Sequence, residues 1–325
     1  MSGTVADAAA LLREHPRIVV ACHEGPDGDA LGSLVGAGRA LARSGWDVAL
    51  WAPGDAALPD DYAWLGYDDV QRDPPGDVGE RLLVALDCGS AERLGGAGHE
   101  VVRAAAATLN IDHHGDNTGF GQVNVVDTQA ACTTILVHRL LAALDVSVDL
   151  DTAVALYVGI VTDTGRFMYA NADAEAHRVA AELIERGVEV DEVFRRLYEG
   201  RSPARALLLG RALSRLELRL GGRLAATWLT IADLDETGAD EADSEGAIDH
   251  LRALRGVEVA ALVREPRAGG GRVQKVSLRS ADPVIDVSRI AHAGGGGGHP
   301  MAAGFSIEGT AADAIALVER ELGGA

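Results

Sequence analysis

The fold is decided by residues 17–43, RIVVACHEGPDGDALGSLVGAGRALAR. This segment opens with an apolar run at Ile18–Cys22, passes through a loop rich in glycine and proline, and ends in an Ala/Leu-rich stretch at Ala30–Arg43. A continuous apolar run is typical of a strand that is buried on both faces of a parallel sheet, and the later stretch has the composition of a helix. The segment therefore predicts a strand–loop–helix unit.

The same alternation repeats through the first half of the chain. Short apolar runs alternate with helical stretches, one of which is predicted at His99–Ala107. The further apolar runs are Val48–Trp51, Leu82–Leu86, Leu109–Ile111 and Val123–Val126. Strands of this kind, separated by helices, are typical of a parallel sheet that is covered by helices on both faces. We therefore predict an α/β domain over residues 1–172.

The pattern changes in the second half of the chain. Residues 173–215 carry apolar residues near helical spacing and predict a helical connector with a break at Gly200. Residues 216–325 predict a smaller α+β domain with a hairpin loop at Arg267–Arg272. Its expected strands are Arg223–Ile231, Val257–Arg264, Val273–Arg279 and Gly304–Ile307, and its expected helices are Glu245–Arg255 and Ala311–Leu322. We expect an active-site cleft between the two domains.

Composition and charge exclude several classes of protein. The N-terminal residues contain no apolar signal core and the chain has no long uncharged apolar stretch, so we expect a cytoplasmic protein with no membrane segment. The net charge is −20, from 29 basic and 49 acidic residues, which argues against a protein that coats long nucleic acid by neutralising its phosphates. The three cysteines are widely spaced and predict neither a disulfide framework nor a zinc site.

Acidic residues and histidines gather where the predicted strands and helices end. His23, Asp27 and Asp29 lie in the loop after the first predicted strand. The other members of this set are Asp87 after the Leu82–Leu86 run, Asp112, His113 and His114 after the Leu109–Ile111 run, and Asp163 at the end of a later helix. Because the carboxyl ends of parallel strands meet at one edge of a sheet, these side chains are expected to converge.

Such a convergence requires a cation. Two carboxylates about 5 Å apart repel by roughly 3 kcal/mol at an effective dielectric constant of about 20. Five carboxylates and three imidazoles would share one crevice here, with no thiolate among the candidate ligands. Oxygen and imidazole ligands suit Mn²⁺ or Mg²⁺ better than structural zinc, and their number suffices for two metals. A two-metal site of this kind suits phosphoryl transfer.

The motifs resemble those of a known family. The pattern His23-x-x-x-Asp27-x-Asp29-Ala30, the strand-end Asp87, the Asp112-His113-His114 triplet and Thr162-Asp163-Thr164-Gly165 occur in the order of the four motifs of the DHH phosphoesterases. The segment GGGGHPMAAG, residues 295–304, is similar to the signature of the DHH-associated C-terminal domain. Together the motifs extend over nearly the whole chain.

The resemblance implies a role for each of these residues. It implies one metal held by His23, Asp27 and Asp87. The ligands that it implies for the second metal are Asp29, Asp87, His113 and Asp163, so that Asp87 bridges the two. The expected metals are two Mn²⁺ ions per chain, with Mg²⁺ as the alternative. Two further residues have implied catalytic roles: His114 faces the substrate phosphate and assists the leaving oxygen, and Asp112 orients a neighbouring group.

The second domain carries the expected substrate-binding residues. Consecutive glycines let backbone N–H groups converge on an anion, and in the family this domain binds nucleotide phosphates. On the strand before the glycines, Lys275, Ser277 and Arg279 share one face because side chains alternate along a strand. The residues predicted from the glycine motif are Gly295, Gly296, Gly297, Gly298 and His299. A flexible glycine linker and a solvated strand face are the alternative interpretations.

The expected substrates are short nucleotides. The length of the chain, its acidic charge and its 4% aromatic residues disfavour a channel that stacks many bases. The resemblance implies hydrolysis of short oligoribonucleotides (nanoRNA, pNpN) or 3′-phosphoadenosine 5′-phosphate (pAp) to mononucleotides, by a hydroxide that bridges two metals. A cyclic-dinucleotide phosphodiesterase, for example acting on cyclic di-AMP, is the alternative, and a non-catalytic nucleotide sensor is a further one. A homodimer is expected from the resemblance alone.

Overall fold

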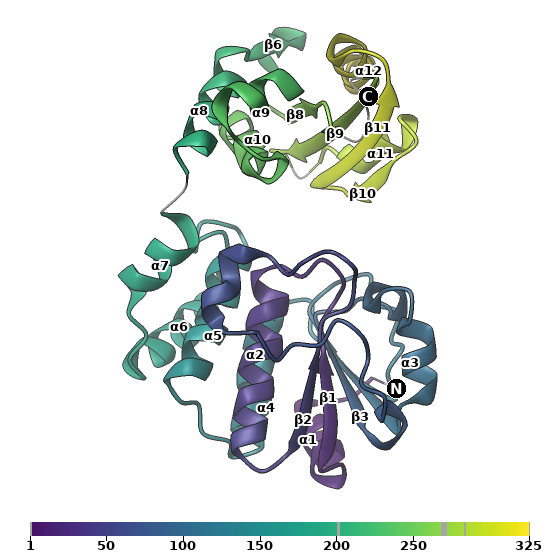
Figure 1. The fold of residues 1–325 in the computed structure, drawn as a ribbon, viewed down its shortest axis with the longest axis vertical. Coiled ribbons are helices and arrows are strands. Elements are labelled where there is room, and N and C mark those ends of the chain that lie inside the picture. The colour runs from purple at the N-terminus through teal and green to yellow at the C-terminus, as the bar shows by residue number, and fades with distance from the viewer. Residues whose placement is uncertain (1, 200–201, 268–271, 283, 325) are drawn as a thin grey trace. The chain divides into compact units, whose positions relative to one another are not determined.

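The computed structural model describes residues 2–199, 202–267, 272–282 and 284–324 (Figure 1). Its contacts divide the chain into two compact units, residues 1–199 and 200–325, and each is described by itself. The helical stretch predicted over residues 173–215 contributes helices to both units. Domain boundaries at residues 172 and 215 therefore stay a prediction, and the predicted break at Gly200 lies outside the described residues.

The first unit is built on a five-stranded parallel sheet with the strand order β2-β1-β3-β4-β5, which confirms the predicted α/β class. Its strands are β1 (Arg17–Ala21), β2 (Asp47–Trp51), β3 (Leu82–Leu86), β4 (Ala107–Asp112) and β5 (Val123–Val126). The prediction of helix through Ala107 was wrong. Ala107 begins β4 because it pairs with Leu82 and is buried in the sheet.

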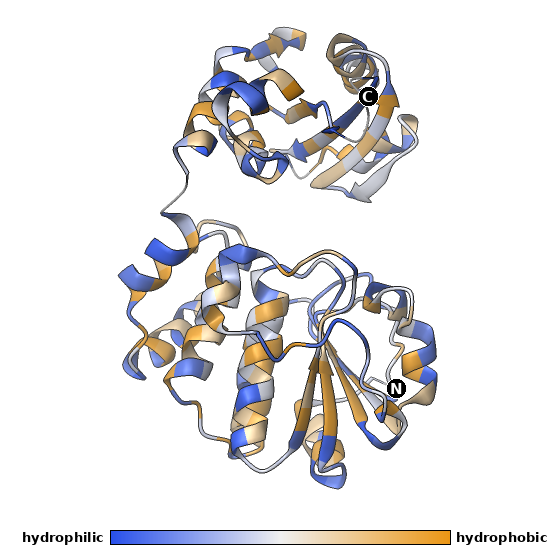
Figure 2. Ribbon diagram, viewed as in Figure 1, coloured by the Kyte–Doolittle hydropathy of each residue, from blue (hydrophilic) through white to orange (hydrophobic). Residues whose placement is uncertain are grey.

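Helices cover both faces of this sheet, as predicted. Ile18 and Val20 of β1 pack against one helical layer, whereas Val19 and Ala21 pack on the opposite face. The first layer contains α1 (Val5–Glu14), α2 (Gly28–Arg43), α4 (Thr133–Ala143), α5 (Leu150–Asp163), α6 (Ala174–Glu185) and α7 (Val190–Tyr198), beside the 3₁₀ helix η1 (Asp60–Leu65). The opposite layer contains η2 (Val78–Glu80), η3 (Ala91–Leu94) and α3 (Gly98–Ala104). The strands at the centre are strongly apolar in Figure 2, as burial on both faces requires.

Glycines bring helices α2 and α5 into close contact. A Cβ atom at Gly32 would lie 2.5 Å from the carbonyl oxygen of Ala155, and one at Gly28 would lie 2.4 Å from the Thr162 hydroxyl. The backbones can therefore approach more closely than larger residues would allow. This contact sets the distance between the start of α2, which carries Asp29, and the end of α5, which carries Asp163.

The second unit is built on a six-stranded mixed sheet with the order β10-β11-β9-β8-β7-β6, in agreement with the predicted α+β domain. Its strands are β6 (Glu217–Arg219), β7 (Leu224–Leu229), β8 (Val259–Arg264), β9 (Val273–Ser280), β10 (Gly297–His299) and β11 (Ala302–Glu308). Strands β7 and β8 are parallel and the other neighbours are antiparallel. The predicted extension of β7 to Ile231 was wrong, because Thr230 caps helix α9, which begins at Ile231.

The helices of the second unit pack on both faces of its sheet, while Lys275 on β9 is exposed and Ser277 and Arg279 are half-buried. The helices here are α8 (Pro203–Ser214), α9 (Ile231–Thr237), α10 (Ala247–Arg252), α11 (Val287–Ala293) and α12 (Ala311–Gly323), with η4 (Leu220–Gly222) and η5 (Glu241–Ser244). Helices α11 and α12 pack on one face, while α8, α9 and α10 pack on the other face near β7 and β8. The face of β9 that carries Lys275, Ser277 and Arg279 belongs to neither apolar cluster. The predicted loop at Arg267–Arg272 falls mostly outside the described residues.

None of the helices in the described parts of the chain combines the length and the apolar character needed to cross a membrane.

The close contact between α2 and α5 can be tested by substitution. We expect Gly32→Ala to lower the free energy of unfolding by about 1–3 kcal/mol, because the new Cβ meets a backbone oxygen that cannot move aside. The control is Gly210→Ala on α8, where a Cβ atom meets nothing within 4 Å and the better helix former should stabilise by about 0.5–1 kcal/mol. Urea denaturation followed by circular dichroism measures both effects. Unchanged stability of Gly32→Ala would contradict the account.

Candidate metal centre

The loop after β1 holds two of the predicted ligands in place. Asp27 caps helix α2, and its Oδ1 accepts hydrogen bonds from the backbone N–H groups of Asp29 and Ala30, both at 3.0 Å. His23 Nδ1 lies 2.9 Å from the carbonyl oxygen of Glu24. Because a carbonyl oxygen can only accept, Nδ1 carries a proton, and Nε2 is left to donate to Asp87 when the ring is protonated or to bind a metal when the ring is neutral. That nitrogen lies 3.5 Å from Asp87 Oδ2 and is free to bind a metal.

Asp87 lies at the centre of the cluster. It follows β3 directly, is 2% exposed, and has a positive φ of 59°, which is uncommon for a residue with a side chain. Its backbone N–H donates to Ile111 at 3.0 Å, and the Thr133 hydroxyl donates to Oδ1 at 2.8 Å. The neighbouring backbone and helix α4 therefore hold this strained residue in a single orientation.

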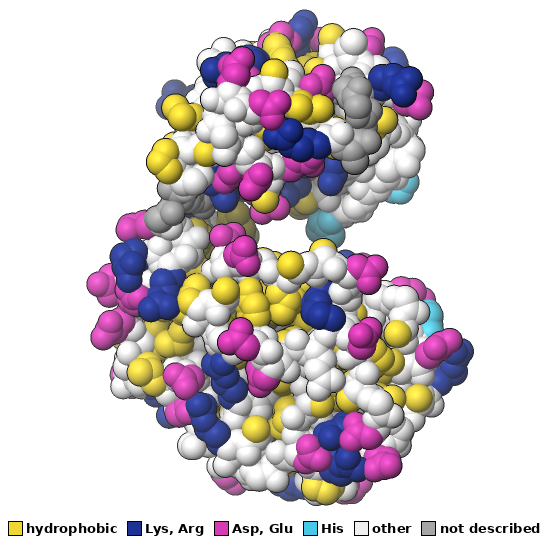
Figure 3. Space-filling model, viewed as in Figure 1, with side chains coloured by type: hydrophobic (Ala, Val, Ile, Leu, Met, Phe, Trp, Pro, Cys, Tyr) yellow, Lys and Arg dark blue, Asp and Glu magenta, His cyan; other side chains and the backbone are white. Residues whose placement is uncertain are grey.

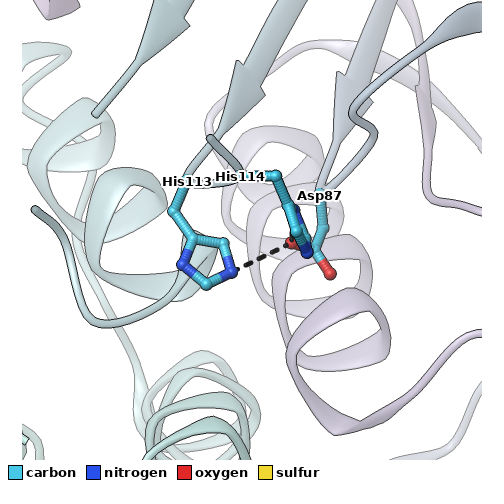
Figure 4. A group of neighbouring side chains, drawn as sticks. All are labelled: Asp87, His113 and His114. Atoms are coloured by element: carbon cyan, nitrogen blue, oxygen red, sulfur yellow. Dashed lines mark ion pairs between the residues drawn. The ribbon is translucent and has the colours of Figure 1, made fainter. Parts of the chain in front are cut away.

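The two adjacent histidines after β4 both approach Asp87. Figure 4 shows their rings beside the Asp87 carboxylate, with His113 Nε2 at 3.7 Å and His114 Nδ1 at 3.6 Å from Oδ1. His113 Nε2 is also 3.8 Å from Asp163 Oδ2. His114 Nδ1 lies 2.8 Å from the fully buried carboxylate of Asp112, which leaves Nε2 as the unengaged nitrogen of that ring.

Asp29 and Asp163 reach the cluster from helix ends. Both carboxylate oxygens of Asp29 accept backbone N–H groups at the start of α4, from Thr133 at 2.7 Å and Thr134 at 2.9 Å. Asp163 is the last residue of α5, and the Asn171 amide lies 3.1 Å from its carbonyl oxygen and 3.4 Å from its Oδ2. Both carboxylates are therefore oriented by neighbouring groups.

Three triplets of ligand atoms lie within 4.8 Å of one another, and each could hold a metal ion. They are His23–Asp27–Asp87, Asp29–His113–Asp163 and Asp87–His113–His114. The first triplet matches one predicted ligand set, and the second contains three of the four ligands predicted for the other metal; Asp87, the fourth, is grouped with His113 in the third triplet. The six predicted ligands therefore lie together at the carboxyl edge of the sheet, and His114 and Asp112 lie beside them.

The electrostatics of the cluster fit a divalent cation. Burial raises the pKa of the Asp29 carboxyl well above its usual range, and the charges of neighbouring aspartates raise it further. Burial also raises the pKa of Asp163 to about 6. Burial opposes the ionisation of Asp87 as well, but a hydrogen bond from His23 and the charges of the nearby histidines lower its pKa below the usual value. Buried carboxylates that resist simultaneous ionisation are stabilised by a cation among them.

The Asp112–His114 pair has a different character. The hydrogen bond to Asp112 raises the pKa of His114 to about 9, and the charge of Asp87 acts in the same direction. Asp112 is itself held by the Asn117 amide, which donates to Oδ2 at 2.6 Å. This arrangement suits an imidazolium that donates a proton from Nε2.

The predicted substrate-binding residues lie on the second unit. Lys275, Ser277 and Arg279 share the face of β9 that belongs to neither apolar cluster, as their alternation predicted. Arg279 pairs across the sheet with Ala302, and Ala302 pairs with His299. Residues directly opposite one another share a face, so Arg279 and His299 form one row with a small alanine between them. His299 Nδ1 accepts the N–H of Met301 at 3.3 Å, which leaves Nε2 as a donor.

The glycine run has a packing role in this structure. The N–H groups of Gly295 and Gly296 donate to the carbonyls of His292 and Ala291, at the end of α11. Gly297 and Gly298 belong to strand β10. Cβ atoms at Gly296 and Gly298 would lie 2.1 Å and 2.6 Å from the backbone of β11. The run is therefore an ordered turn and strand rather than a linker, and phosphate binding by these four glycines stays a prediction.

Three further residues orient the cluster and were not predicted from the sequence. Thr133 contacts Asp87 and Asp29, Asn117 contacts Asp112, and Asn171 contacts Asp163. Each lies outside the motifs, and Thr133 is far from its partners in sequence. For Thr133, the one local signal of a functional role was its position at the start of a helix, where backbone N–H groups lack partners within the helix.

Comparison with known proteins identifies the family. The model of the DHH family N-terminal domain matches residues 17–160, and that of the DHHA1 domain matches residues 221–324. The bifunctional oligoribonuclease and PAP phosphatase NrnA of Thermus thermophilus is 37% identical over 90% of this chain and 84% of its own length. This chain belongs to the DHH family.

Two further proteins share the DHH architecture. The NrnA protein of Bacillus subtilis is 27% identical over 89% of both chains. The crystal structure of an exopolyphosphatase-related protein from Bacteroides fragilis superposes with a TM-score of 0.88 and 25% sequence identity, and covers 97% of this chain and 94% of that one.

The hydrogen bond from Thr133 to Asp87 can be tested by substitution. We expect Thr133→Val to raise the dissociation constant for Mn²⁺ about tenfold or more, because Asp87 loses the hydroxyl that orients its Oδ1. Isothermal titration calorimetry measures this. The control is Ser33→Ala, which removes a buried hydroxyl with no hydrogen-bond partner among the described residues and should leave Mn²⁺ affinity unchanged. Wild-type affinity in Thr133→Val would show that Asp87 needs no such support.

Proposed function

We propose that this chain is a metal-dependent phosphoesterase that hydrolyses short oligoribonucleotides and pAp to mononucleotides. The observation that carries the proposal is the convergence of four carboxylates and the imidazoles of His23 and His113 around one point. The names of the NrnA relatives, which describe oligoribonuclease and PAP phosphatase activities, support the substrate class.

The residues present suit two divalent cations, for which we propose Mn²⁺. His23, Asp27 and Asp87 would hold one ion. The ligands of the other would be Asp29, Asp87, His113 and Asp163. When bound, the ions supply Lewis acidity toward the phosphoryl oxygens and a lowered pKa for water at the site.

The chain itself supplies orientation and a proton. Asp112 fixes the ring of His114 and favours its protonated form, because their hydrogen bond raises the pKa of His114 to about 9. His114 then donates from Nε2 to the departing ribose oxygen. Asp87 keeps its orientation through Thr133, so the two ligand sets share a fixed carboxylate.

We propose that the second unit binds the substrate through Arg279 and His299, with Lys275 and Ser277 on the same face. Arg279 supplies a permanent positive charge beside the donor of His299. A guanidinium and an imidazole in one row match the oxygens of a phosphate group. Ser277 is oriented by Arg264, which donates to its hydroxyl at 2.7 Å.

The net charge of −20 favours short substrates over a long nucleic acid. On the face seen in Figure 3, the Lys and Arg side chains of the described residues are scattered among Asp and Glu, and they form no continuous basic stripe. A long strand bound without sequence preference needs such a stripe along its backbone. Cyclic dinucleotides remain an alternative substrate, and a homodimer stays a prediction.

The proposal is tested by turnover of pApA, pAp and cyclic di-AMP in Mn²⁺, with products separated by chromatography. We expect AMP from pApA and pAp. Asp87→Ala should lower turnover by at least a thousandfold, since both ligand sets lose their shared carboxylate. Asp151→Asn, at an exposed ion pair with Arg43, is the control and should keep wild-type activity. Near-normal turnover by a folded Asp87→Ala protein would refute the proposal.

The role of Arg279 has its own test. We expect Arg279→Ala to raise KM for pApA about tenfold with a smaller change in kcat, because a charge-assisted phosphate contact is lost. Arg289→Ala on α11, which replaces an exposed arginine of the same unit, is the matched control. An unchanged KM in Arg279→Ala would remove this residue from the binding site.

A further inference from the structure

A polar pocket with a volume of about 360 Å³ adjoins the metal centre within the first unit. It is lined by Gly89, Ser90, Arg93, His114, Asp116 and Thr118. His114 belongs both to this pocket and to the ligand cluster, so the two are continuous. The volume lies at the lower end of the range for small-molecule sites. None of the lining side chains is apolar or aromatic apart from the imidazole, so the pocket suits the ribose–phosphate part of a nucleotide better than a base.

Arg93 is the permanent cation of this pocket. Its side chain is exposed, and no hydrogen bond or ion pair joins its guanidinium to any residue in the described part of the chain. Most described arginines of the first unit, by contrast, have such partners; Arg17, Arg81 and Arg139 are examples. In a chain with a net charge of −20, an arginine that faces a pocket without an acidic partner is available to an anionic ligand.

The backbone around Arg93 is fixed relative to the metal centre. The N–H of Glu24, the residue after His23, donates to the carbonyl oxygen of Arg93 at 2.7 Å. Two other lining residues are also joined, since the N–H of Thr118 donates to the carbonyl oxygen of Gly89 at 2.8 Å. Arg93 is therefore presented from an ordered turn beside the first ligand loop.

We infer that this pocket binds a second phosphate of the substrate, one that is not cleaved, and that Arg93 is a specificity-determining residue for nucleotides with a terminal phosphate. The inference rests on the proposed phosphoesterase function and adds a subsite to it. Asp116 lines the same pocket and would accept a hydrogen bond from a ribose hydroxyl rather than bind the phosphate. The pocket would thus recognise the ribose and phosphate that neighbour the reacting group.

The test compares substrates that differ by one terminal phosphate. We would measure kcat/KM for pApA, ApAp and ApA with the wild type, Arg93→Gln and Arg93→Lys. We expect Arg93→Gln to lower kcat/KM for either pApA or ApAp at least about tenfold more than it lowers kcat/KM for ApA. Arg93→Lys should recover part of this loss. The end of the nucleotide whose phosphate is affected identifies the side that enters the pocket. The matched control is Arg103→Gln, at an exposed arginine on α3 that does not line the pocket.

Two outcomes of the kinetic comparison overturn the inference. An equal loss for all three substrates would place Arg93 at the reacting phosphate rather than at a second one. A loss no larger than that of Arg103→Gln would remove it from the site. If the wild type cleaves none of the three nucleotides, the proposed function fails. In that case, calorimetry of the same nucleotides with the wild type and Arg93→Gln decides the inference. The substitution must weaken the binding of pApA or ApAp more than that of ApA.

Discussion

The structure of the first unit depends on the mutual repulsion of carboxylates that are held close together. Asp29 and Asp87 are each 2% exposed, and Asp163 lies beside them. Each pair of such charges repels by roughly 3 kcal/mol at about 5 Å and an effective dielectric constant of about 20. The raised pKa values of Asp29 and Asp163 follow from this crowding and from burial. A fold that keeps these groups together must compensate the repulsion with donors and with cations.

The donors come from elements that are distant in sequence. The start of helix α4 donates two backbone N–H groups to Asp29 and the Thr133 hydroxyl to Asp87. The glycine contacts between α2 and α5 allow Asp29 and Asp163 to approach one another. The positive φ of Asp87 turns its carboxylate toward the histidines. The edge of the sheet, the start of α4 and the end of α5 therefore each contribute residues to the ligand cluster.

Much of this could be predicted from the sequence, because buried parallel strands and ligands at their ends leave local patterns. The five strands of the first unit and the grouping of the six ligand residues follow from such patterns. The end of helix α3 could not be predicted, because the alanines at 104–107 are compatible with either a helix or a strand. Only the pairing of Ala107 with Leu82 assigns Ala107 to β4. Thr133 and Arg93 could not be identified either. Their importance comes from tertiary contacts and from the pocket, which no spacing along the chain records.

We propose that these residues form a two-cation site shared through Asp87. The most direct measurement is the number of Mn²⁺ ions bound per chain after equilibrium dialysis, together with their electron paramagnetic resonance spectrum. The account predicts two ions per chain and a spectrum of two coupled Mn²⁺ ions, with the coupling lost in Asp87→Ala. One ion per chain, or two ions without coupling in the wild type, would contradict it.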